Sequence, residues 1–365
     1  PAAGEDRTGG DDAADHGGGV RELTVIATGL DNPRGLDLRG TRLYVAEAGR
    51  GGDGPCVLTN QGTEECLDRS GAVTQITRSG QRRVLTGLAS LAGIEGGFAV
   101  GPDDVAHCFG RILTSVGAGG GVPDTAVRDS LGDDGISLGQ IMVRRGQRSR
   151  PHRGVLPFAD LLAFEELNNP QTDELETDAT GLLCDRNTLY AADAGANDLL
   201  AIDRRGRISV VAVFPNRNVP LPDGSIRAMQ SVPTSVAKGP DGALYVGELT
   251  GVPFPKGGAR VYRVVPGHEP EIYADGFTNI TDIGFDRDGN LYVLQISTEG
   301  LLAGDFGGRL IQVAPDGTRT VLLDGDDLNA PFGLAISRRG EIFVSNCSIC
   351  AGAGEVLRLA PPQRR

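Results

Sequence analysis

The segment Leu43-Tyr44-Val45-Ala46-Glu47-Ala48-Gly49 decides the fold, because its pattern recurs along the chain. In each copy an aromatic residue is followed by a small or branched apolar residue, one further residue and a polar residue. The clear copies are Tyr190-Ala191-Ala192-Asp193, Tyr245-Val246-Gly247-Glu248, Tyr292-Val293-Leu294-Gln295 and Phe343-Val344-Ser345-Asn346, and a weaker one is Ile112-Leu113-Thr114-Ser115. Six copies predict six repeated structural units, with one such strand in each.

The spacing of the copies predicts the architecture. Tyr245 lies 55 residues after Tyr190 and 47 residues before Tyr292. Alternating apolar segments with short turns between them predict four strands in each unit. Four-stranded units of this length are typical of propeller blades. We therefore predict an all-β fold, a six-bladed β-propeller of four-stranded antiparallel blades.

The chain ends suggest how the ring closes. The last unit has three predicted strands, whereas the chain begins with a spare strand at Glu22 to Thr28. If this N-terminal strand completes the last blade, two open sheet edges disappear at once. Residues 1–20 are rich in Gly and acidic residues with little apolar content, which predicts a disordered tail. Residues 21–365 are the predicted propeller domain.

The predicted connections fall into two groups. Turns between first and second strands, and between third and fourth strands, are short and share one face of the disc, here called the turn face. The other face, here called the loop-rich face, is predicted to hold every long insertion, at 48–70, 89–101, 116–138, 145–177, 215–231, 249–258 and 296–308. Within these, Phe158 to Leu167 has a helical pattern that Asn168-Asn169-Pro170 ends. Because binding residues gather on loops held by a rigid scaffold, the loop-rich face is the predicted binding face.

Polar residues are predicted to converge where the channel opens on this face. The second strands end in Glu47, Ser115, Asp193, Glu248, Gln295 and Asn346, and the innermost strands begin near Arg34, Asp103, Asp104 and Asp282. The predicted ligand-binding set is Arg34, Glu47, Asp103, Asp104, Asp193, Glu248, Asp282, Gln295 and Asn346. Carboxylate and amide oxygens in this number suit Ca²⁺. Two alternatives stay open: the side chains cap loop backbones, or some carboxylates are catalytic.

Charge and hydropathy exclude some classes of partner. The formal net charge is −13, which argues against a nucleic-acid partner, since phosphates require a basic surface. The same charge is compatible with solubility alone or with cationic ligands. No apolar segment approaches the roughly 18 residues of a membrane span. We expect a monomer.

The six cysteines suggest an oxidising compartment. They are Cys56, Cys66, Cys108, Cys184, Cys347 and Cys350. Their even number, and a chain that begins at Pro1, predict an exported protein from which a signal peptide was removed. We expect disulfides between Cys56 and Cys66 and between Cys347 and Cys350, although the latter two could be free thiols or a redox or metal pair. Cys108 and Cys184 either bridge two blades or stay as buried thiols.

Nucleophilic catalysis has little support in the sequence. Among four histidines, only His107 is placed to line the channel, and a packing role suits it better. No nucleophile elbow, zinc-ligand histidine pair or phosphate-binding loop is present.

Three segments resemble one family. They are Tyr44 to Gly52 with Pro55-Cys56, Leu249-Thr250-Gly251-Val252-Pro253-Phe254-Pro255 with Ala259 to Tyr262, and Ser345-Asn346 with Gly352 to Val356. On these residues the chain, over about 30 to 360, resembles the ScyD/ScyE family, which is named for a gene cluster that makes the pigment scytonemin. The resemblance implies an exported propeller related to the NHL and gluconolactonase-like six-bladed group. It also implies a channel-mouth Ca²⁺ that would map onto Glu47, Asp193, Glu248 and Asn346.

Two functions from different classes follow from these observations. The favoured one is a binding module that holds a small molecule, glycan or protein on the loop-rich face. The alternative is a calcium-dependent lactonase or esterase-like hydrolase, in which the ion polarises the ester carbonyl. The loop asymmetry, the polar mouth and the lack of a catalytic motif favour the binding module. An NHL-type RNA-binding role is disfavoured by the acidic charge.

Overall fold

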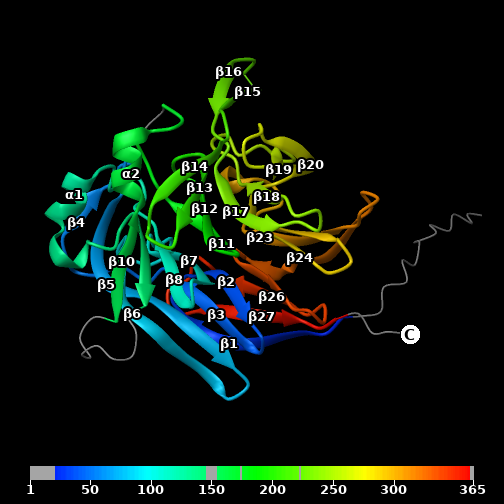
Figure 1. The fold of residues 1–365 in the computed structure, drawn as a ribbon, viewed down its shortest axis with the longest axis horizontal. Coiled ribbons are helices and arrows are strands. Elements are labelled where there is room, and N and C mark those ends of the chain that lie inside the picture. Colours follow the sequence, from blue (N-terminus) through cyan, green and yellow to red (C-terminus); the bar gives the residue numbers. More distant parts are fainter. Residues whose placement is uncertain (1–20, 145–153, 173–174, 222, 362–365) are drawn as a thin grey trace, which may run out of the picture.

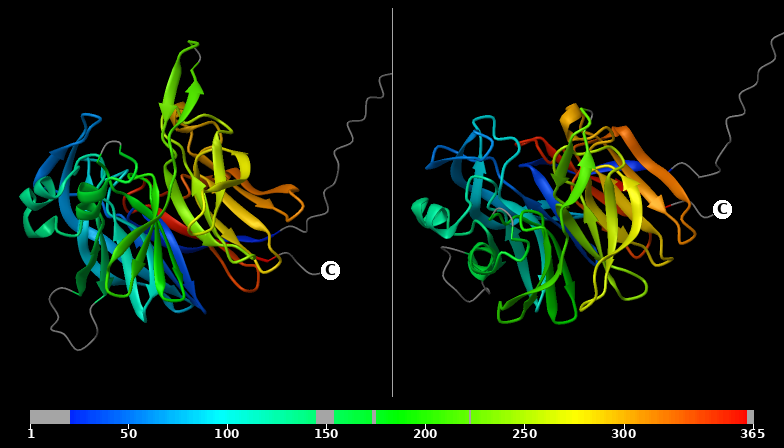
Figure 2. Two further views of the ribbon diagram at one scale, coloured as in Figure 1. Left: turned by 45° about the horizontal axis from the view of Figure 1, so that its top comes forward. Right: turned by 90° about the horizontal axis from the view of Figure 1, so that it is seen from above.

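The chain folds as the predicted six-bladed β-propeller (Figure 1). The structure, a computed structural model, describes residues 21–144, 154–172, 175–221 and 223–361. The tail predicted at 1–20 lies outside the described residues. Six antiparallel sheets are arranged around a channel that all six innermost strands line (Figure 2).

The first three blades follow one another along the chain. Blade I contains β2, β3, β5 and β6, at Pro33–Arg39, Arg42–Glu47, Glu64–Thr77 and Gly80–Ala92. Blade II contains β7, β8, β9 and β10, at Pro102–Cys108, Arg111–Val116, Gln140–Arg144 and Val155–Asp160. Blade III contains β11, β12, β13 and β14, at Ala179–Asp185, Thr188–Asp193, Asp198–Asp203 and Ile208–Val213.

The last three blades repeat this order. Blade IV contains β17, β18, β19 and β20, at Pro233–Lys238, Leu244–Glu248, Ala259–Val264 and Glu271–Phe277. Blade V contains β21, β22, β23 and β24, at Ile280–Phe285, Leu291–Gln295, Gly307–Val313 and Arg319–Asn329. Blade VI contains β25, β26 and β27, at Leu334–Ile336, Ile342–Asn346 and Gly354–Leu359.

The N-terminal strand closes the ring, as predicted. Strand β1, at Leu23–Leu30, pairs with β27 and is the outer strand of blade VI. Leu23 lies opposite Leu359, and Leu30 lies opposite Gly354. The ends of the propeller are thus joined by main-chain hydrogen bonds, which leaves neither edge of the ring open.

Apolar side chains fill the space between neighbouring blades. The aromatic residue of the repeated segment is buried in four of the blades, where Tyr44, Tyr245, Tyr292 and Phe343 occupy equivalent positions. Tyr44 packs with Val105 between blades I and II, and Tyr245 packs with Ile283 between blades IV and V. Each repeat therefore buries its apolar face against the next one.

The innermost strands approach one another so closely that side chains are excluded at two positions. A Cβ added at Gly181 would lie 2.6 Å from Cα of Ser235, and one added at Gly333 would lie 2.5 Å from the carbonyl oxygen of Arg34. Glycine at these positions lets the inner strands of successive blades lie side by side.

Several insertions decorate the blades. The short strand β4, at Cys56–Leu58, pairs with β5, and β15 with β16, at Arg217–Pro220 and Ile226–Met229, form a hairpin that stands out from the ring (Figures 1 and 2). Helix α1 spans Thr125–Ser130, and two 3-10 turns span Gly132–Asp134 and Leu301–Ala303.

One predicted insertion needs correction. We placed all of 145–177 on the loop-rich face, but Val155–Asp160 forms β10, the outer strand of blade II. Strand β9 therefore ends, and β10 begins, at the turn face. The predicted helix is present but starts later, as α2 at Leu161–Asn168. Asp160 sets this start, because its carboxylate accepts a hydrogen bond from the main-chain nitrogen of Ala163 at 3.0 Å.

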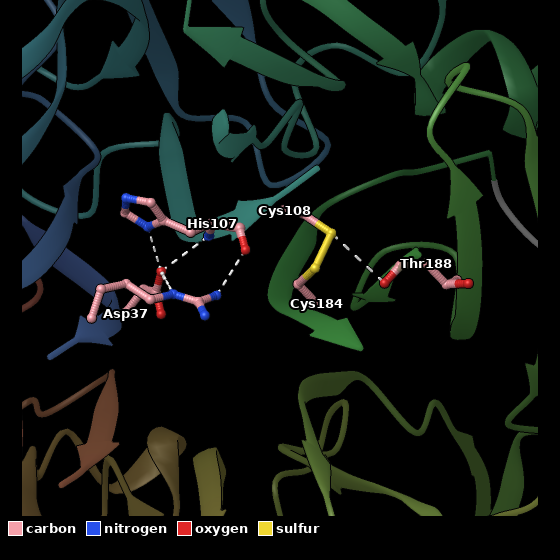
Figure 3. Close-up of a disulfide and its surroundings, with 6 residues drawn as sticks. Asp37, His107, Cys108, Cys184 and Thr188 are labelled. Carbon is pink, nitrogen blue, oxygen red and sulfur yellow. Dashed lines mark hydrogen bonds and ion pairs between the residues drawn. A yellow bond between two sulfur atoms is a disulfide. The ribbon is translucent and has the colours of Figure 1, made fainter. Parts of the chain in front are cut away.

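All six cysteines form disulfides. Cys56 pairs with Cys66 and Cys347 pairs with Cys350, as predicted. Cys108 and Cys184 also form a disulfide, which was one of the two predicted alternatives. It joins β7 of blade II to β11 of blade III (Figure 3).

Candidate functional site

A cleft of about 790 Å³ opens among the loops of the loop-rich face. Segments from all the blades except the last contribute to its walls. The residues that line it include Asn60, Gln61, Glu176, Asp178, Asn216, Arg227, Gln230, Val232, Leu249, Thr250, Val252, Phe254 and Leu301. The cleft includes most of the Leu249 to Pro255 segment, which is the most specific part of the family resemblance.

Two β-branched residues in the cleft wall have a left-handed backbone. Val232 has φ 56° and Thr250 has φ 77°. The segments beside β17 and β18 that contain them are joined by main-chain hydrogen bonds from the nitrogen of Leu249 to the oxygen of Val232 at 2.9 Å and from the nitrogen of Thr250 to the oxygen of Ser231 at 3.0 Å. Such a conformation costs about 1–3 kcal/mol for a side chain of this kind. At Val232 it is a feature of the repeat, because Asn32, Asn279 and Ala330 also have positive φ before their innermost strands. Thr250 is outside this pattern.

Asp178 in the cleft lies beside the buried Asp103, and the two form the carboxyl pair. Only 4% of Asp103 is exposed. A Cβ added at Gly117 would lie 2.0 Å from Oδ1 of Asp178 and 2.6 Å from Oδ2 of Asp103. Both oxygens therefore occupy the space beside this glycine. Burial raises the pKa of Asp103 to about 6. Burial, and then the negative charge of Asp103, raise the pKa of Asp178 well above its ordinary value.

Arg34 is the positive group next to the carboxyl pair. Its Nε lies 3.9 Å from Oδ1 of Asp103. The guanidinium makes its close contacts with other groups. Its Nη2 donates a hydrogen bond to the carbonyl oxygen of Ala99 at 3.0 Å, and its central carbon lies 4.7 Å from the ring centre of Phe332. Of the predicted ligand-binding residues, the structure thus brings Arg34 and Asp103 together next to the cleft.

The polar residues that end the second strands are buried and bonded within their own blades. Glu47, Asp193, Gln295 and Asn346 each accept a hydrogen bond from the main-chain nitrogen of a residue 15–17 positions earlier, in the segment that leads into the innermost strand. Ser115 accepts from the nitrogen of Asp104 at 3.1 Å. These residues cap loop backbones here, which was one of the sequence alternatives.

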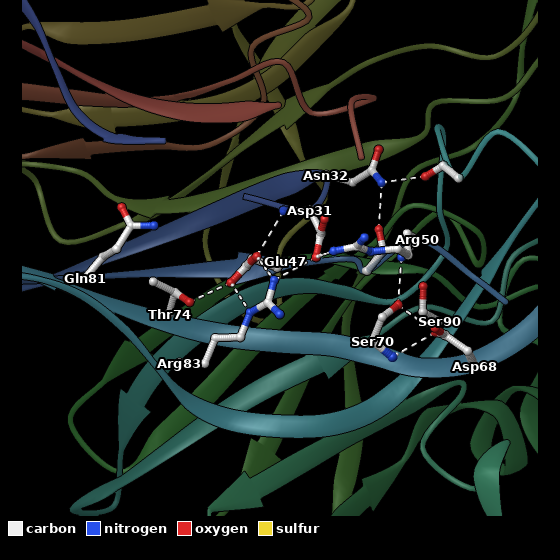
Figure 4. A network of polar contacts seen from close by, with 12 residues as sticks. Asp31, Asn32, Glu47, Arg50, Asp68, Ser70, Thr74, Gln81, Arg83 and Ser90 are labelled. Carbon is white, nitrogen blue, oxygen red and sulfur yellow. Dashed lines mark hydrogen bonds and ion pairs between the residues drawn. The ribbon is translucent and has the colours of Figure 1, made fainter. Parts of the chain in front are cut away.

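Glu47 is the best-satisfied member of this set (Figure 4). Its carboxylate is fully buried and accepts from the main chain of Asp31 at 2.9 Å and from Thr74 at 2.5 Å. Arg83 donates to both of its oxygens, from Nε at 3.2 Å and from Nη2 at 2.7 Å. Arg83 and Arg50 each also contact Asp31 at 2.7 Å, so two guanidinium groups balance these two buried carboxylates.

Glu248 has the same kind of surroundings on the opposite side of the ring. It is fully buried, and Arg217 donates to its Oε1 at 2.6 Å. Ser231 and Tyr262 donate to its Oε2 at 2.7 and 3.2 Å. As at Glu47, an arginine already neutralises the carboxylate.

These contacts test whether the predicted calcium ligands fit an ion. Ca²⁺ requires six to eight oxygens at about 2.3–2.6 Å. Glu47, Asp193 and Glu248 do not bring their carboxylate oxygens within 4.8 Å of one another, and arginines contact two of them. Within the described ranges, the one group that meets this spacing is Cys56, Glu64 and Cys66, where the two sulfurs are joined in a disulfide. As arranged here, the predicted ligands do not fit one shared ion. Calcium binding stays a prediction.

Asp104 and Asp282 line the central channel, in a cavity of about 250 Å³. Asp104 accepts from the nitrogens of Val105 at 2.7 Å and Leu182 at 2.6 Å. Asp282 likewise accepts hydrogen bonds from the main-chain nitrogens of Ile283 at 2.7 Å and Leu334 at 2.6 Å. Each carboxylate therefore ties the inner strand of its own blade to that of the next. Burial raises the pKa of Asp282 to about 7.

His107 has a packing role beside the channel (Figure 3). Its Nδ1 lies 2.6 Å from Oδ2 of Asp37, to which its main-chain nitrogen also donates at 3.0 Å. The ring packs against Tyr44 with a centroid distance of 4.4 Å. These contacts orient Asp37 and join blades I and II.

No sequence pattern predicted Asp178, Glu176, Arg227 or the amide side chains of the cleft. One signal was available for Asp178, which stands two residues before Thr180 in a segment that leads into an innermost strand. The equivalent segments supplied Arg34 and Asp103. The others come from insertions that follow no repeat, so no pattern marks them.

Comparisons with known proteins support the fold. No protein-family model and no curated protein sequence matches the chain. A protein of unknown function from Bacteroides thetaiotaomicron VPI-5482 is similar at a TM-score of 0.56 and 11% identity, over 93% of this chain and 76% of its own. A glucose dehydrogenase is similar at a TM-score of 0.52 and 13% identity, over 93% of this chain and 99% of its own. A streptogramin B lyase is similar at a TM-score of 0.48 and 10% identity, over 93% of this chain and 98% of its own. At these identities the likeness shows the fold alone.

The described part of the chain contains no helix with the length and apolar character that crossing a membrane requires.

Proposed function

We propose that the protein is a binding module that holds a small molecule in the cleft of the loop-rich face. The cleft itself carries this proposal. Its volume of about 790 Å³ lies within the range of about 300–1,000 Å³ that is typical of small-molecule sites. Apolar side chains such as Leu249 and Phe254 alternate in its walls with amides and charged groups, which is the mixture that binds and orients an organic ligand.

The strained wall of the cleft supports the same proposal. Thr250 holds an unfavourable backbone conformation, and its hydroxyl is fully buried with no hydrogen-bond partner among the described residues. A wall that only closed the fold would gain stability from glycine at such positions. We infer that the conformation positions the Leu249 to Phe254 loop for a ligand.

We further propose that the protein is of the ScyD/ScyE type and acts outside the cytoplasm. The family resemblance supports the first point. The three disulfides support the second, because disulfides persist mainly in oxidising compartments.

Hydrolysis of a lactone or ester in the same cleft is the second candidate. The observation in its favour is the carboxyl pair, since a carboxyl with a pKa of about 6 can act as a general acid or base near neutral pH. Turnover of a lactone and aryl-ester panel, abolished by Asp103→Asn, would support hydrolysis over simple binding.

Ligand-observed NMR with a small-molecule library tests the binding function. Ala228 is exposed and lines the cleft, so Ala228→Trp fills the site without disturbing the core. Ser79→Trp, in an exposed turn on the opposite face, is the matched control. We expect compounds that bind the wild type and Ser79→Trp but not Ala228→Trp. Binding that Ala228→Trp leaves unchanged, or no binding from a broad library, would speak against the cleft as the site.

A further inference from the structure

We propose that the turn face carries an interaction surface for an anionic lipid membrane. Exposed arginines at the turn ends of blades VI, I, II and III form this surface, here called the basic half of the turn face. It lies on the opposite side of the disc from the cleft. The inference is therefore independent of the small-molecule binding proposed above.

The basic half includes six exposed arginines that make no ion pair among the described residues. One lies at the turn between the first and second strands of each of the four blades, and two lie in the turn between β13 and β14. They are Arg42, Arg111, Arg186, Arg204, Arg205 and Arg338. Unpaired and exposed guanidinium groups are free to bind oxyanions from outside the protein.

The acidic residues of the same turns do not compensate these arginines. Four carboxylates lie in or beside the turns, and each pairs with a different cation. The pairs are Asp37 with Arg39, Asp185 with Lys238, Asp203 with Arg207 and Glu341 with Arg358, at nitrogen–oxygen distances of 2.5–3.0 Å. The six arginines therefore form a positive surface on a chain whose formal net charge is −13. Charge is thus divided unequally between this surface and the rest of the protein.

Contacts between neighbouring turns hold the basic half together. The disulfide between Cys108 and Cys184 joins blades II and III directly beside their inner turns (Figure 3). Nη2 of Arg39 donates a hydrogen bond to the carbonyl oxygen of His107 at 2.8 Å, which joins the β2–β3 turn to blade II. The arginines are therefore presented by turns of one connected scaffold, so little order has to be gained when they bind together.

A planar partner matches the way these charges are spread. The arginines come from four neighbouring blades and from both inner and outer turns, so they cover an area instead of following one groove. The inner turns have two residues between their strands in blades I, II and III and five in blade VI, so none of these four projects as a long loop. A bilayer presents phosphates over such an area, and a planar guanidinium can donate two hydrogen bonds to one phosphate.

The chemistry of these turns predicts reversible electrostatic binding. Among the described residues, none of the exposed large apolar side chains lies in the turns of the basic half. The membrane is therefore held by charge without an apolar anchor, and salt should release the protein. A protein docked in this way keeps the cleft of the loop-rich face directed toward the solution.

Cosedimentation of the intact protein with lipid vesicles tests this surface. One set contains equal parts of phosphatidylglycerol and phosphatidylcholine, and the other contains phosphatidylcholine alone. We expect binding to the anionic vesicles only, and its loss at about 1 M salt, where the Debye length falls to about 3 Å. The triple variant Arg111→Gln, Arg186→Gln and Arg338→Gln should bind on the order of a hundredfold more weakly.

A matched variant controls for the change in net charge. Arg69→Gln, Lys256→Gln and Arg309→Gln together remove three positive charges from the loop-rich side, and we expect vesicle affinity within about twofold of the wild type. Ala228→Trp should also bind vesicles as the wild type does, so a failure of the cleft as a ligand site would leave this inference intact.

Three results would overturn the membrane assignment. The first is no binding to the anionic vesicles, or equal binding to the neutral ones. The second is a loss of binding in the control triple variant as large as that in the turn-face variant. The third is alginate, a soluble linear polyanion, binding at the same salt while the anionic vesicles do not, which would assign the surface to an acidic glycan. The two vesicle types are compared on the wild type, so that result stands even if a variant does not fold.

Discussion

The carboxylate of Asp282 accepts a hydrogen bond from the main-chain nitrogen of Leu334, 2.6 Å away, and thereby joins the innermost strands of blades V and VI. Asp104 makes the equivalent bond to Leu182 between blades II and III. In a ring of six blades these two carboxylates face each other across the channel. Burial raises the pKa of Asp104, and the charge of Asp282 raises it further.

Because Asp104 and Asp282 are buried in the channel, we predict that the free energy of unfolding depends on pH. The pKa of Asp282 is about 7 in the folded protein, against about 3.9 in an unfolded chain. The folded state therefore holds the proton more tightly, so the contribution of Asp282 is full below about pH 4 and is lost as pH rises through about 7. We expect Asp282→Asn to reduce the fall in the free energy of unfolding between about pH 4 and 7, measured by urea titration. Parallel pH profiles of the variant and the wild type would contradict this.

Most of the architecture could be predicted from the sequence, because the repeated segment marks one strand in each blade. Strand β10 was missed, since Val155-Leu156-Pro157-Phe158 contains a proline and runs into a helical pattern. The position of Glu47 at a strand end was also predictable. Its contacts were not, because the pattern of a strand does not show which loop folds back on its end. Asp178 stands just before an innermost strand, but that position does not show that its side chain lies beside Asp103, so only the folded chain brings the two together.

An arginine paired with the buried Glu47 should matter more than one paired with an exposed carboxylate. Arg83→Met leaves the fully buried carboxylate of Glu47 without its counter-charge, so we expect a loss of about 3 kcal/mol in the free energy of unfolding. Arg309→Met breaks an exposed pair with Asp324 and should cost less than about 1 kcal/mol. Chemical denaturation of both variants at one pH makes the comparison, and equal losses would argue against the role given to Arg83.

The two longer disulfides should stabilise the fold to different degrees. Cys108 and Cys184 are 76 residues apart in sequence, whereas Cys56 and Cys66 are 10 apart. By chain entropy we expect the double alanine variant at Cys108 and Cys184 to lose about 4 kcal/mol and the one at Cys56 and Cys66 about 2–3 kcal/mol. Urea unfolding under non-reducing conditions measures both. The reverse order would show that the entropy of the unfolded loop does not control these bridges.

Chelation tests the predicted calcium site. Because Arg83 and Arg217 already neutralise Glu47 and Glu248, we expect EDTA to leave the melting temperature of the purified protein unchanged. A clear fall with EDTA, reversed by added calcium and absent in Glu248→Gln, would instead support the metal ligands that the family resemblance implies. Asp288→Asn, on the turn face, serves as the control.

Occupation of the cleft is tested most directly by methyl NMR of the intact protein titrated with a compound that the ligand-observed NMR screen finds to bind. Leu, Val and Ile methyl groups report on every part of the propeller, and Val232, Leu249, Val252 and Leu301 lie in the cleft. We expect saturable shifts at these four residues, with the methyl groups of the channel and the turn face unchanged. Shifts that are absent, or that centre on the channel residues Leu182 and Ile283, would contradict the cleft as the ligand site.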